Sequence, residues 1–148
     1  EGHYHAHKVV HFLWRDNKVV RTKKGKTETF RVPAGHLNAL DAFLAVRKMA
    51  LKPGDVVRVP LFDSRKQYLV VVRVLKRKTL RAPWGERVPC VVIEPKLKTK
   101  GIFSSKGKVK IWLTDDARHI PLKMVAQIKF GHIVATLADY RNKPQMNP

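Results

Sequence analysis

Residues 66–97, with the sequence KQYLVVVRVLKRKTLRAPWGERVPCVVIEPKL, decide the fold of this protein. They contain two long runs rich in β-branched residues, 66–80 and 87–97, with the turn-forming tripeptide Pro83-Trp84-Gly85 between them. This pattern predicts two consecutive antiparallel strands, the first of them unusually long. Because twist accumulates along strands as long as those predicted at 66–80 and 121–130, we expect the sheet to curl or close rather than stay flat.

The first of these two runs carries apolar residues on both of its faces. From Gln67 to Leu75 the apolar pattern is interrupted by Arg73. Strands that read this way are typically buried on both sides. We therefore predict that this run is a central strand, covered on both faces.

Similar short runs, each bounded by turn-forming residues, extend on both sides of these two runs. We predict strands at 4–14, 18–24, 27–32, 55–62, 66–80, 87–97, 101–105, 108–114, 121–130 and 132–140. The predicted fold class is mostly β: an antiparallel meander curled into a barrel-like or half-barrel sheet, with one short covering helix near 38–49.

That helix is predicted because residues 38–49 have helical rather than strand periodicity. Asn38 can cap the first turn, and Pro53-Gly54 prevents the helix from continuing. An apolar stripe that would face the sheet consists of Leu40, Phe43, Leu44 and Val46.

The strand predicted at 121–130 alternates clearly between its two faces. One face carries Met124, Ala126, Ile128 and Phe130, and the other carries Lys123, Gln127 and Lys129. Gly131 follows, and Ile133, Ala135 and Leu137 supply a matching apolar face on the returning strand. We predict a half-buried hairpin with a tight turn at Gly131.

The composition limits the class of protein. A chain of 148 residues with 44% hydrophobic residues can bury a real core, and we expect a single β domain over residues 1–148. The 31 Lys and Arg residues outnumber the 11 Asp and Glu residues, and the formal net charge of +20 attracts polyanions.

Cys90 lies in a valine-rich run, where we expect a small buried hydrophobic residue rather than a nucleophile. The longest apolar run, Leu69 to Val72, is too short for a membrane span.

The C-terminal part of the chain carries a series of motifs that resembles a known family. In order they are Gly101-Ile102-Phe103, Gly107, Ile111-Trp112-Leu113-Thr114-Asp115-Asp116, Ile120-Pro121-Leu122 and Gly131. This order, with Arg47 at the end of the helix and the turn Pro53-Gly54-Asp55, resembles a bacterial exported family catalogued as domain of unknown function 3108. The resemblance implies a precursor with a signal peptide, an envelope location, a curved barrel-like β domain and no established activity. It also implies that the domain is incomplete at its N-terminal side, which would leave an unpaired strand edge near 4–14 where a partner chain can pair.

Few residues suggest metal or catalytic chemistry. His3, His5, His7 and His11 would alternate along one strand face, but no cysteine or carboxylate lies nearby to complete a ligand set. His5 and His7 are therefore a weak metal candidate, and we expect no cofactor. Asp115-Asp116 fits a hairpin turn better than a catalytic pair, with Asp116 close to Arg118.

Other sequence signals also favour packing over chemistry. Trp112 is expected to pack, under the helix, rather than to present its ring to a partner. The sequence contains no nucleophile-elbow motif, phosphate-cradling glycine loop or zinc-type cysteine pattern, so we expect that the protein is not an enzyme.

The basic residues are grouped at strand spacing. Two sets of three lysines each share one strand face, and we hypothesise that they form one stripe: Lys96, Lys98, Lys100, Lys106, Lys108 and Lys110. A second cluster in a separate hairpin consists of Arg21, Lys23, Lys24 and Lys26, and a third consists of Lys76, Arg77, Lys78 and Arg81. The alternative interpretation is a solvated sheet face that charge keeps soluble.

These patterns favour a non-catalytic exported protein of the periplasm or outer envelope, acting alone or as a subunit of a larger envelope assembly. Its lysine stripe would bind an anionic envelope polymer, such as lipopolysaccharide, or an acidic protein surface. One alternative is a nucleic-acid-binding module, in which Trp14, Phe30 and Trp84 would stack on bases. The other is a carrier of a lipid in the mouth of the barrel, which requires a large apolar pocket.

Overall fold

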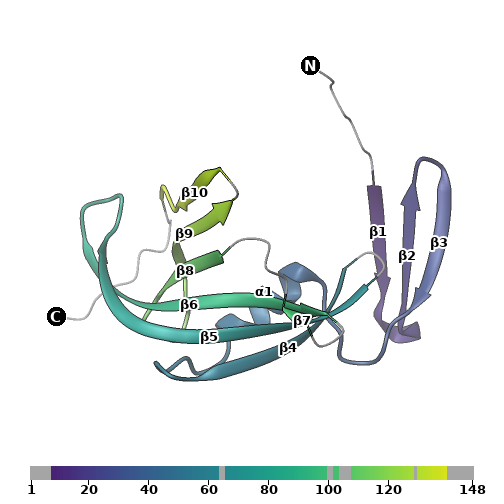
Figure 1. Ribbon diagram of the computed structural model, residues 1–148, viewed down its shortest axis with the longest axis horizontal. Helices are drawn as coiled ribbons and strands as arrows, with labels where there is room; N and C mark the ends of the chain where they lie inside the picture. Colours follow the sequence, from purple (N-terminus) through teal and green to yellow (C-terminus); the bar gives the residue numbers. More distant parts are fainter. Residues whose placement is uncertain (1–7, 64–65, 100–101, 104–107, 129, 140–148) are drawn as a thin grey trace, which may run out of the picture.

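The protein forms two antiparallel sheets and one helix, shown by a computed structural model that describes residues 8–63, 66–99, 102–103, 108–128 and 130–139 (Figure 1). The strands are β1 (Lys8–Leu13), β2 (Lys18–Lys23), β3 (Lys26–Arg31), β4 (Val56–Asp63), β5 (Lys66–Arg81), β6 (Arg87–Thr99), β7 (Ile102–Phe103), β8 (Lys108–Thr114), β9 (Pro121–Ile128) and β10 (Gly131–Thr136). The helix α1 spans Ala39–Arg47, and a short 3-10 helix, η1, spans Trp14–Asp16. The mostly β fold class is thus confirmed, and a described strand overlaps each predicted strand region.

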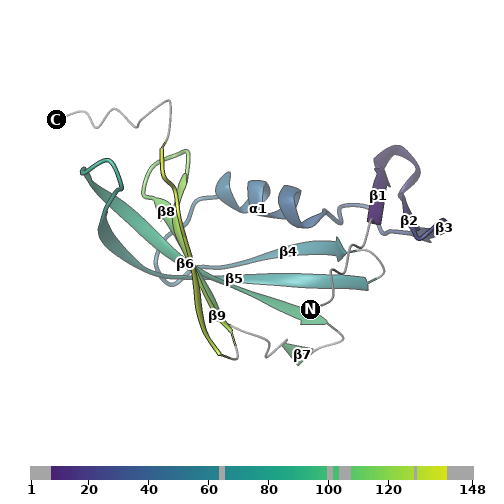
Figure 2. The same cartoon turned by 90° about the horizontal axis from the view of Figure 1, so that it is seen from above.

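The strands separate into two sheets rather than one meander. The smaller sheet has the order β1-β2-β3, and the larger has the order β10-β9-β8-β6-β5-β4, with β7 paired to β6. Within the described residues no pairing joins β4 to β10, so the larger sheet is curled but open (Figure 2). The long hairpin of β5 and β6 bends at its far end (Figure 1), and a register shift between Val74 and Lys76 marks a bulge of the kind that increases local bending and twist.

The helix begins at the residue that its sequence predicts, but the face that packs on the sheet differs from the predicted one. The Asn38 side chain accepts a 2.8 Å hydrogen bond from the backbone N–H of Asp41, which confirms the predicted cap. Ala42 and Val46 are buried, whereas Leu40 is 67% exposed and Leu44 is 39% exposed. The predicted apolar stripe is therefore wrong for these two leucines. The small Ala42 side chain lets the helix approach the sheet closely, and this turns the two leucines toward solvent.

The main core lies between α1 and one face of the larger sheet, which we name the inner face (Figure 2). Its fully buried members include Val72, Val91, Ile93 and Leu113, from three neighbouring strands. In the described part of the chain, no helix packs on the opposite face, which we name the outer face. The prediction that β5 is covered on both sides is therefore only half right, because Arg73 is exposed there although Val71 is buried.

Two smaller clusters complete the core. On the outer face, Cys90 and Val88 pack with Ile120 and Leu122 at the bent end of the larger sheet. The third cluster joins the two sheets, because Val19 of β2 packs with Phe62 of β4. In this third cluster the rings of Phe30 and Phe62 lie 6.1 Å apart, within the range of favourable aromatic pairs.

The hairpin of β9 and β10 pairs as predicted but is not half buried. Gly131 lies opposite Ile128, and the positive φ of 120° at Gly131 explains the tight turn. However, Ile128 is 48% exposed and Ile133 is 52% exposed. The apolar alternation is real, but α1 packs on β4 and leaves this end of the sheet without a cover.

Candidate functional site

The outer face of the larger sheet collects basic side chains from strands that are far apart in the sequence. Antiparallel partners point to the same face, so each row of paired residues can be followed across the sheet. In one row Arg58 of β4 pairs with Val71 of β5, which pairs with Lys96 of β6. In the next row on this face, Arg73 of β5 lies between its two cross-strand partners, Val56 of β4 and Glu94 of β6.

Four of the six lysines of the predicted stripe also lie on this face. Lys96 and Lys98 come from β6, and Lys108 and Lys110 come from β8. Because neighbouring residues of a strand alternate between faces, these lysines lie on the face opposite the inner-face residues Ile93 and Ile111. The two strands pair only from Cys90–Ile93, so the two pairs of lysines share a face but lie beyond the paired region. Lys100 and Lys106 lie outside the described residues.

A further row across four strands adds Lys76, which belongs to the third predicted cluster, and Lys123, which lies in none of the predicted basic clusters. Lys76 pairs with Val92, Val92 with Trp112, and Trp112 with Lys123. The Lys123 Nζ atom lies 5.4 Å from the centre of the Trp112 ring, within the range of a cation–π interaction. Trp112 does pack, but in the outer-face cluster with Ile120 and not under the helix. The prediction that Trp112 packs under the helix is wrong, because the strand register puts its ring on the face opposite the helix.

We name the resulting surface the basic outer face. It consists of Arg58, Arg73, Lys76, Lys96, Lys98, Lys108, Lys110 and Lys123. Glu94 is the one carboxylate that the strand registers place among these side chains in the described part of the chain, and it forms a 3.2 Å ion pair with Lys96. The face is therefore strongly positive, and its long aliphatic stems help to bury Val71.

The second predicted cluster, in the smaller sheet, is divided. Arg21 is only 9% exposed, and its guanidinium donates to the Glu28 carboxylate at 2.9 Å, so it is already paired. Lys23 lies opposite Lys26 at the tip of the hairpin, and Lys24 and Gly25 form the turn with positive φ angles. This tip is a small basic surface of its own, on the other sheet.

The third predicted cluster is divided between the two faces of the long hairpin. Lys76 and Lys78 face outward with Val92 and Cys90, whereas Arg77 and Arg81 fall on the inner side because neighbouring strand residues alternate. Arg77 donates to the Asp115 carboxylate at 2.7 Å. Arg81 lies directly opposite Arg87, and both line an open hollow of about 450 Å³ near the hairpin turn.

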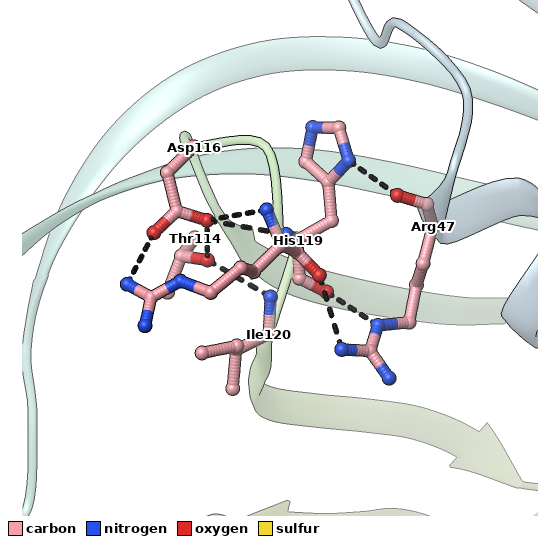
Figure 3. A network of polar contacts seen from close by, with 6 residues as sticks. Arg47, Thr114, Asp116, His119 and Ile120 are labelled. Carbon is pink, nitrogen blue, oxygen red and sulfur yellow. Dashed lines mark hydrogen bonds and ion pairs between the residues drawn. The ribbon is translucent and has the colours of Figure 1, made fainter. Parts of the chain in front are cut away.

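The densest polar network of the described chain lies at the turn between β8 and β9 (Figure 3). The Thr114 hydroxyl donates to Asp116 Oδ1 at 2.7 Å and accepts from the backbone N–H of Ile120 at 2.8 Å. Asp116 Oδ1 also accepts from the backbone N–H groups of Arg118 and His119, and Oδ2 accepts from the Arg118 guanidinium at 2.8 Å. The expected turn and its salt bridge are thus confirmed.

The same network fastens the helix to the sheet. Arg47, the last residue of α1, donates from Nε to the carbonyl of His119 at 2.8 Å and from Nη2 to the carbonyl of Arg118 at 3.0 Å. In return, His119 Nδ1 lies 2.8 Å from the carbonyl oxygen of Arg47. Because a carbonyl oxygen can only accept, this bond places the proton on Nδ1. Buried His119 has a φ of 43°, so the network holds the backbone in the left-handed region.

The chemistry of these groups fits a structural role. Partial burial raises the pKa of Asp116, but hydrogen bonds from Arg118 and Thr114 outweigh it and hold that pKa below its ordinary value. The carboxylate is ionised and its acceptor sites are occupied, so it is poorly placed to take a proton from a substrate. Burial raises the pKa of Cys90 to about 11, and its thiol donates to the Val88 carbonyl. Cys90 is thus the buried hydrophobic residue that its sequence context predicts.

The histidines that the sequence suggested as metal ligands do not form a described site. His3, His5 and His7 lie outside the described residues, and His11 is exposed on β1, which is an edge strand of the smaller sheet. Among the described residues no three His, Cys, Asp or Glu side chains gather as they would around a metal ion.

The aromatic residues expected to stack on bases are engaged in packing where they are described. Phe30 packs on Phe62, and Trp84 packs in the outer-face cluster, with its indole N–H donating to Glu86 at 2.9 Å. Neither helix of the described chain has the long apolar stretch that crossing a membrane requires. The inner face is filled by α1 and the main core, and an open hollow of about 510 Å³ lies elsewhere, between Lys18, Arg31 and Gln67.

The fold and the site define a protein with an open, curled antiparallel sheet that carries a covering helix on one face and a basic surface on the other. The chain belongs to the family described as protein of unknown function (DUF3108), whose family model matches residues 1–138. The match extends well beyond the C-terminal motifs that carry the resemblance. No curated protein and no solved structure matches the chain. Thr114 and Asp116, which lie in the stretch that carries the resemblance, have a physical role, since they build the turn that holds Arg47.

Proposed function

We propose that this protein is a non-catalytic, exported envelope protein whose basic outer face binds an anionic partner, either an acidic envelope polymer or an acidic protein surface. The observation that carries the proposal is the charge of this face. The strand registers place eight Lys and Arg side chains on this one face, where Glu94 is the one carboxylate among the described residues. Export to the periplasm or outer envelope of a Gram-negative cell rests on what the family resemblance implies.

Charge complementarity gives this face a physical means of recognition. A surface of one sign attracts a polyanion and speeds its encounter, and neutralising the polyanion releases condensed counterions. Arg58, Arg73 and Lys110 have exposed side chains and come from three different strands, so they can contact separate charges of one extended ligand. The sheet between them keeps their spacing fixed.

The polar network supports a binding role over a catalytic one. Asp116 is saturated with hydrogen bonds, His119 uses Nδ1 to hold the helix, and the Cys90 thiol is protonated and buried. These three groups therefore have structural tasks. The charge of the outer face is the feature on which the proposed function rests.

A salt titration tests the proposal. Binding of the purified protein to lipopolysaccharide, heparin and single-stranded DNA is measured at several salt concentrations. If five or six cations contact a polyanionic lattice, the slope of log affinity against log salt is about −4 to −5. The double variant Arg73→Gln, Lys110→Gln should make this slope shallower by about 1.5 to 2, because two contacts are lost.

The matched control removes the same charge elsewhere. Lys48→Gln with Lys52→Gln changes two exposed lysines near the end of α1, outside the basic outer face, and should leave the slope nearly unchanged. Equal slopes for both double variants would mean that binding depends only on the net charge of the protein, and would refute a specific binding face. Cell fractionation of the full gene product, with periplasmic and cytoplasmic markers, tests export, and recovery in the cytoplasm would refute that part.

A further inference from the structure

Among the residues that the structure describes, the outermost strand of the larger sheet, β10, has no strand on its free edge, and apolar side chains are exposed on both of its faces. Ile133 is 52% exposed and Val134 is 57% exposed, and the other residues of the strand are exposed as well. Exposed apolar edge strands are sites at which proteins pair with other chains, and soluble proteins normally protect them with charge, proline or a covering segment.

The other edge of the same sheet has such protection. In β4, Pro60 lacks an N–H group, Arg58 adds a charge, and Leu37 forms a parallel bridge to Leu61. Leu37 donates to the Pro60 carbonyl at 3.1 Å and accepts from the N–H of Phe62 at 2.8 Å, so the free backbone groups there are used. In β10, by contrast, the sequence GHIVAT contains no lysine, arginine or proline.

The backbone groups on the free edge of β10 can be assigned. Leu137, just past the strand, donates to the Leu122 carbonyl at 2.9 Å, and hydrogen-bonded positions alternate along an antiparallel pair. Ile133 and Ala135 therefore bond inward to β9. His132, Val134 and Thr136 direct their N–H and C=O groups away from the sheet.

The side chains around this edge have a different character on each face. On the inner face, Ile133 and Ala135 lie beside Ala126 and Met124, so a new strand would there meet apolar surface. On the outer face, Val134 lies beside Val125, and Val125 beside Lys110, and Lys123 of β9 lies opposite Thr136. Residues 121–136 contain no Asp or Glu.

We propose that β10 pairs with an extended segment of a partner protein, added as a further strand of the sheet, whose inward side chains are apolar and whose outward side chains are acidic. Its backbone would bond to His132, Val134 and Thr136, and its carboxylates would lie about 10 Å from Lys123, two strand spacings away and within reach of long side chains. A second copy of this chain fits less well, because its own β9 and β10 bring one lysine, Lys123, and no carboxylate. The inference does not depend on polymer binding by the basic outer face.

The test uses an eight-residue capped peptide in which valine and glutamate alternate, with backbone amide exchange followed by NMR. Binding should slow the exchange of the amides of His132, Val134 and Thr136, while Ile133 and Ala135, already bonded to β9, change little. The same peptide with lysine for glutamate should bind at least about tenfold more weakly, because it repels the outer face.

Two variants locate the binding. Val134→Pro removes one outward N–H group that β9 does not use, and it should weaken peptide binding about tenfold or more. If thermal melting shows that this variant has lost the hairpin, Val134→Glu keeps the backbone N–H group in place and should also weaken peptide binding, because its carboxylate repels the glutamates of the peptide on the outer face. The double variant Arg73→Gln, Lys110→Gln separates the two proposals: it should weaken polymer binding while the peptide still protects the three edge amides.

Three results would overturn the inference. The acidic peptide could bind without protecting the three edge amides, which would mean that only charge attracts it. The lysine peptide could bind equally well, which would remove the acidic requirement. The same amides could become protected at high protein concentration without peptide, together with a dimer in ultracentrifugation, which would make a second copy the occupant.

Discussion

Replacing Thr114 with valine is expected to destabilise the protein strongly while keeping its shape. Valine has nearly the same volume but no hydroxyl, so the bond to Asp116 and the acceptor for the N–H of Ile120 disappear together. Thr114 is 1% exposed and Ile120 is 3% exposed, so water cannot easily replace either bond.

The magnitude follows from these two losses. A hydrogen bond to a charged group contributes about 1.5–3 kcal/mol, and leaving a buried N–H group without a partner costs about 1–3 kcal/mol. Because the two effects share one hydroxyl and do not simply add, we expect the free energy of unfolding to fall by about 2–4 kcal/mol. For a chain of this size the melting temperature should fall by roughly 5–15 °C.

Urea denaturation at neutral pH measures the change, with an unaltered m-value showing that the unfolding reaction is the same. Thr114→Ser is the matched control, because it keeps the hydroxyl and loses one methyl group, at a cost of about 1 kcal/mol. If the valine variant were as stable as the serine variant to within about 0.5 kcal/mol, the hydroxyl would not be what holds this turn together.

The pH dependence of the same network has a defined sign. The pKa of Asp116 is lower in the folded protein than its ordinary value of 3.8. The ionised carboxylate therefore stabilises the fold fully above that ordinary value, and this stabilisation is lost as the pH falls through the lower folded pKa. The difference in unfolding free energy between the wild type and Asp116→Asn should narrow below about pH 4. A difference that stayed constant down to pH 2 would refute the link to ionisation.

Three further predictions concern other parts of the described chain. Arg47→Met removes both side-chain bonds to the turn after β8 and should lower the free energy of unfolding by about 1–3 kcal/mol, with Lys48→Met nearly neutral in the same urea assay. Arg87→Glu replaces a cross-strand repulsion with an attraction to Arg81 and should raise stability by about 0.2–1 kcal/mol at low salt, an effect that high salt should remove. The Cys90 thiol should be inert to a thiol reagent at pH 8 in the folded protein and react rapidly in urea; rapid labelling of the native protein would contradict its burial.

The positions of the elements could be predicted because their signals are local. Alternation, β-branched residues and turns such as Lys24-Gly25 identify a strand or hairpin wherever it lies in space. Asn38 likewise marks the start of α1 through a bond within its own turn. The motif from Ile111 to Asp116 could be recognised, but its purpose could not, because Arg47 reaches it from more than sixty residues away.

The candidate site could be predicted only in part. The spacing of Lys96 and Lys98 shows that they share a face, which holds for any strand. Nothing in the sequence places Arg58, Arg73 or Lys123 beside them, since that depends on which strands are neighbours and in what register.

The sequence by itself determined the strands, the helix, the buried cysteine and the basic character of this protein, because each depends on side chains close together along the chain. The tertiary structure alone decided which faces are covered. An alternating pattern states which residues share a face, but whether another layer meets that face depends on where distant segments pack. For this reason Leu40 and Ile133 are exposed although their patterns predict burial, and α1 covers β4 while β10 is left open.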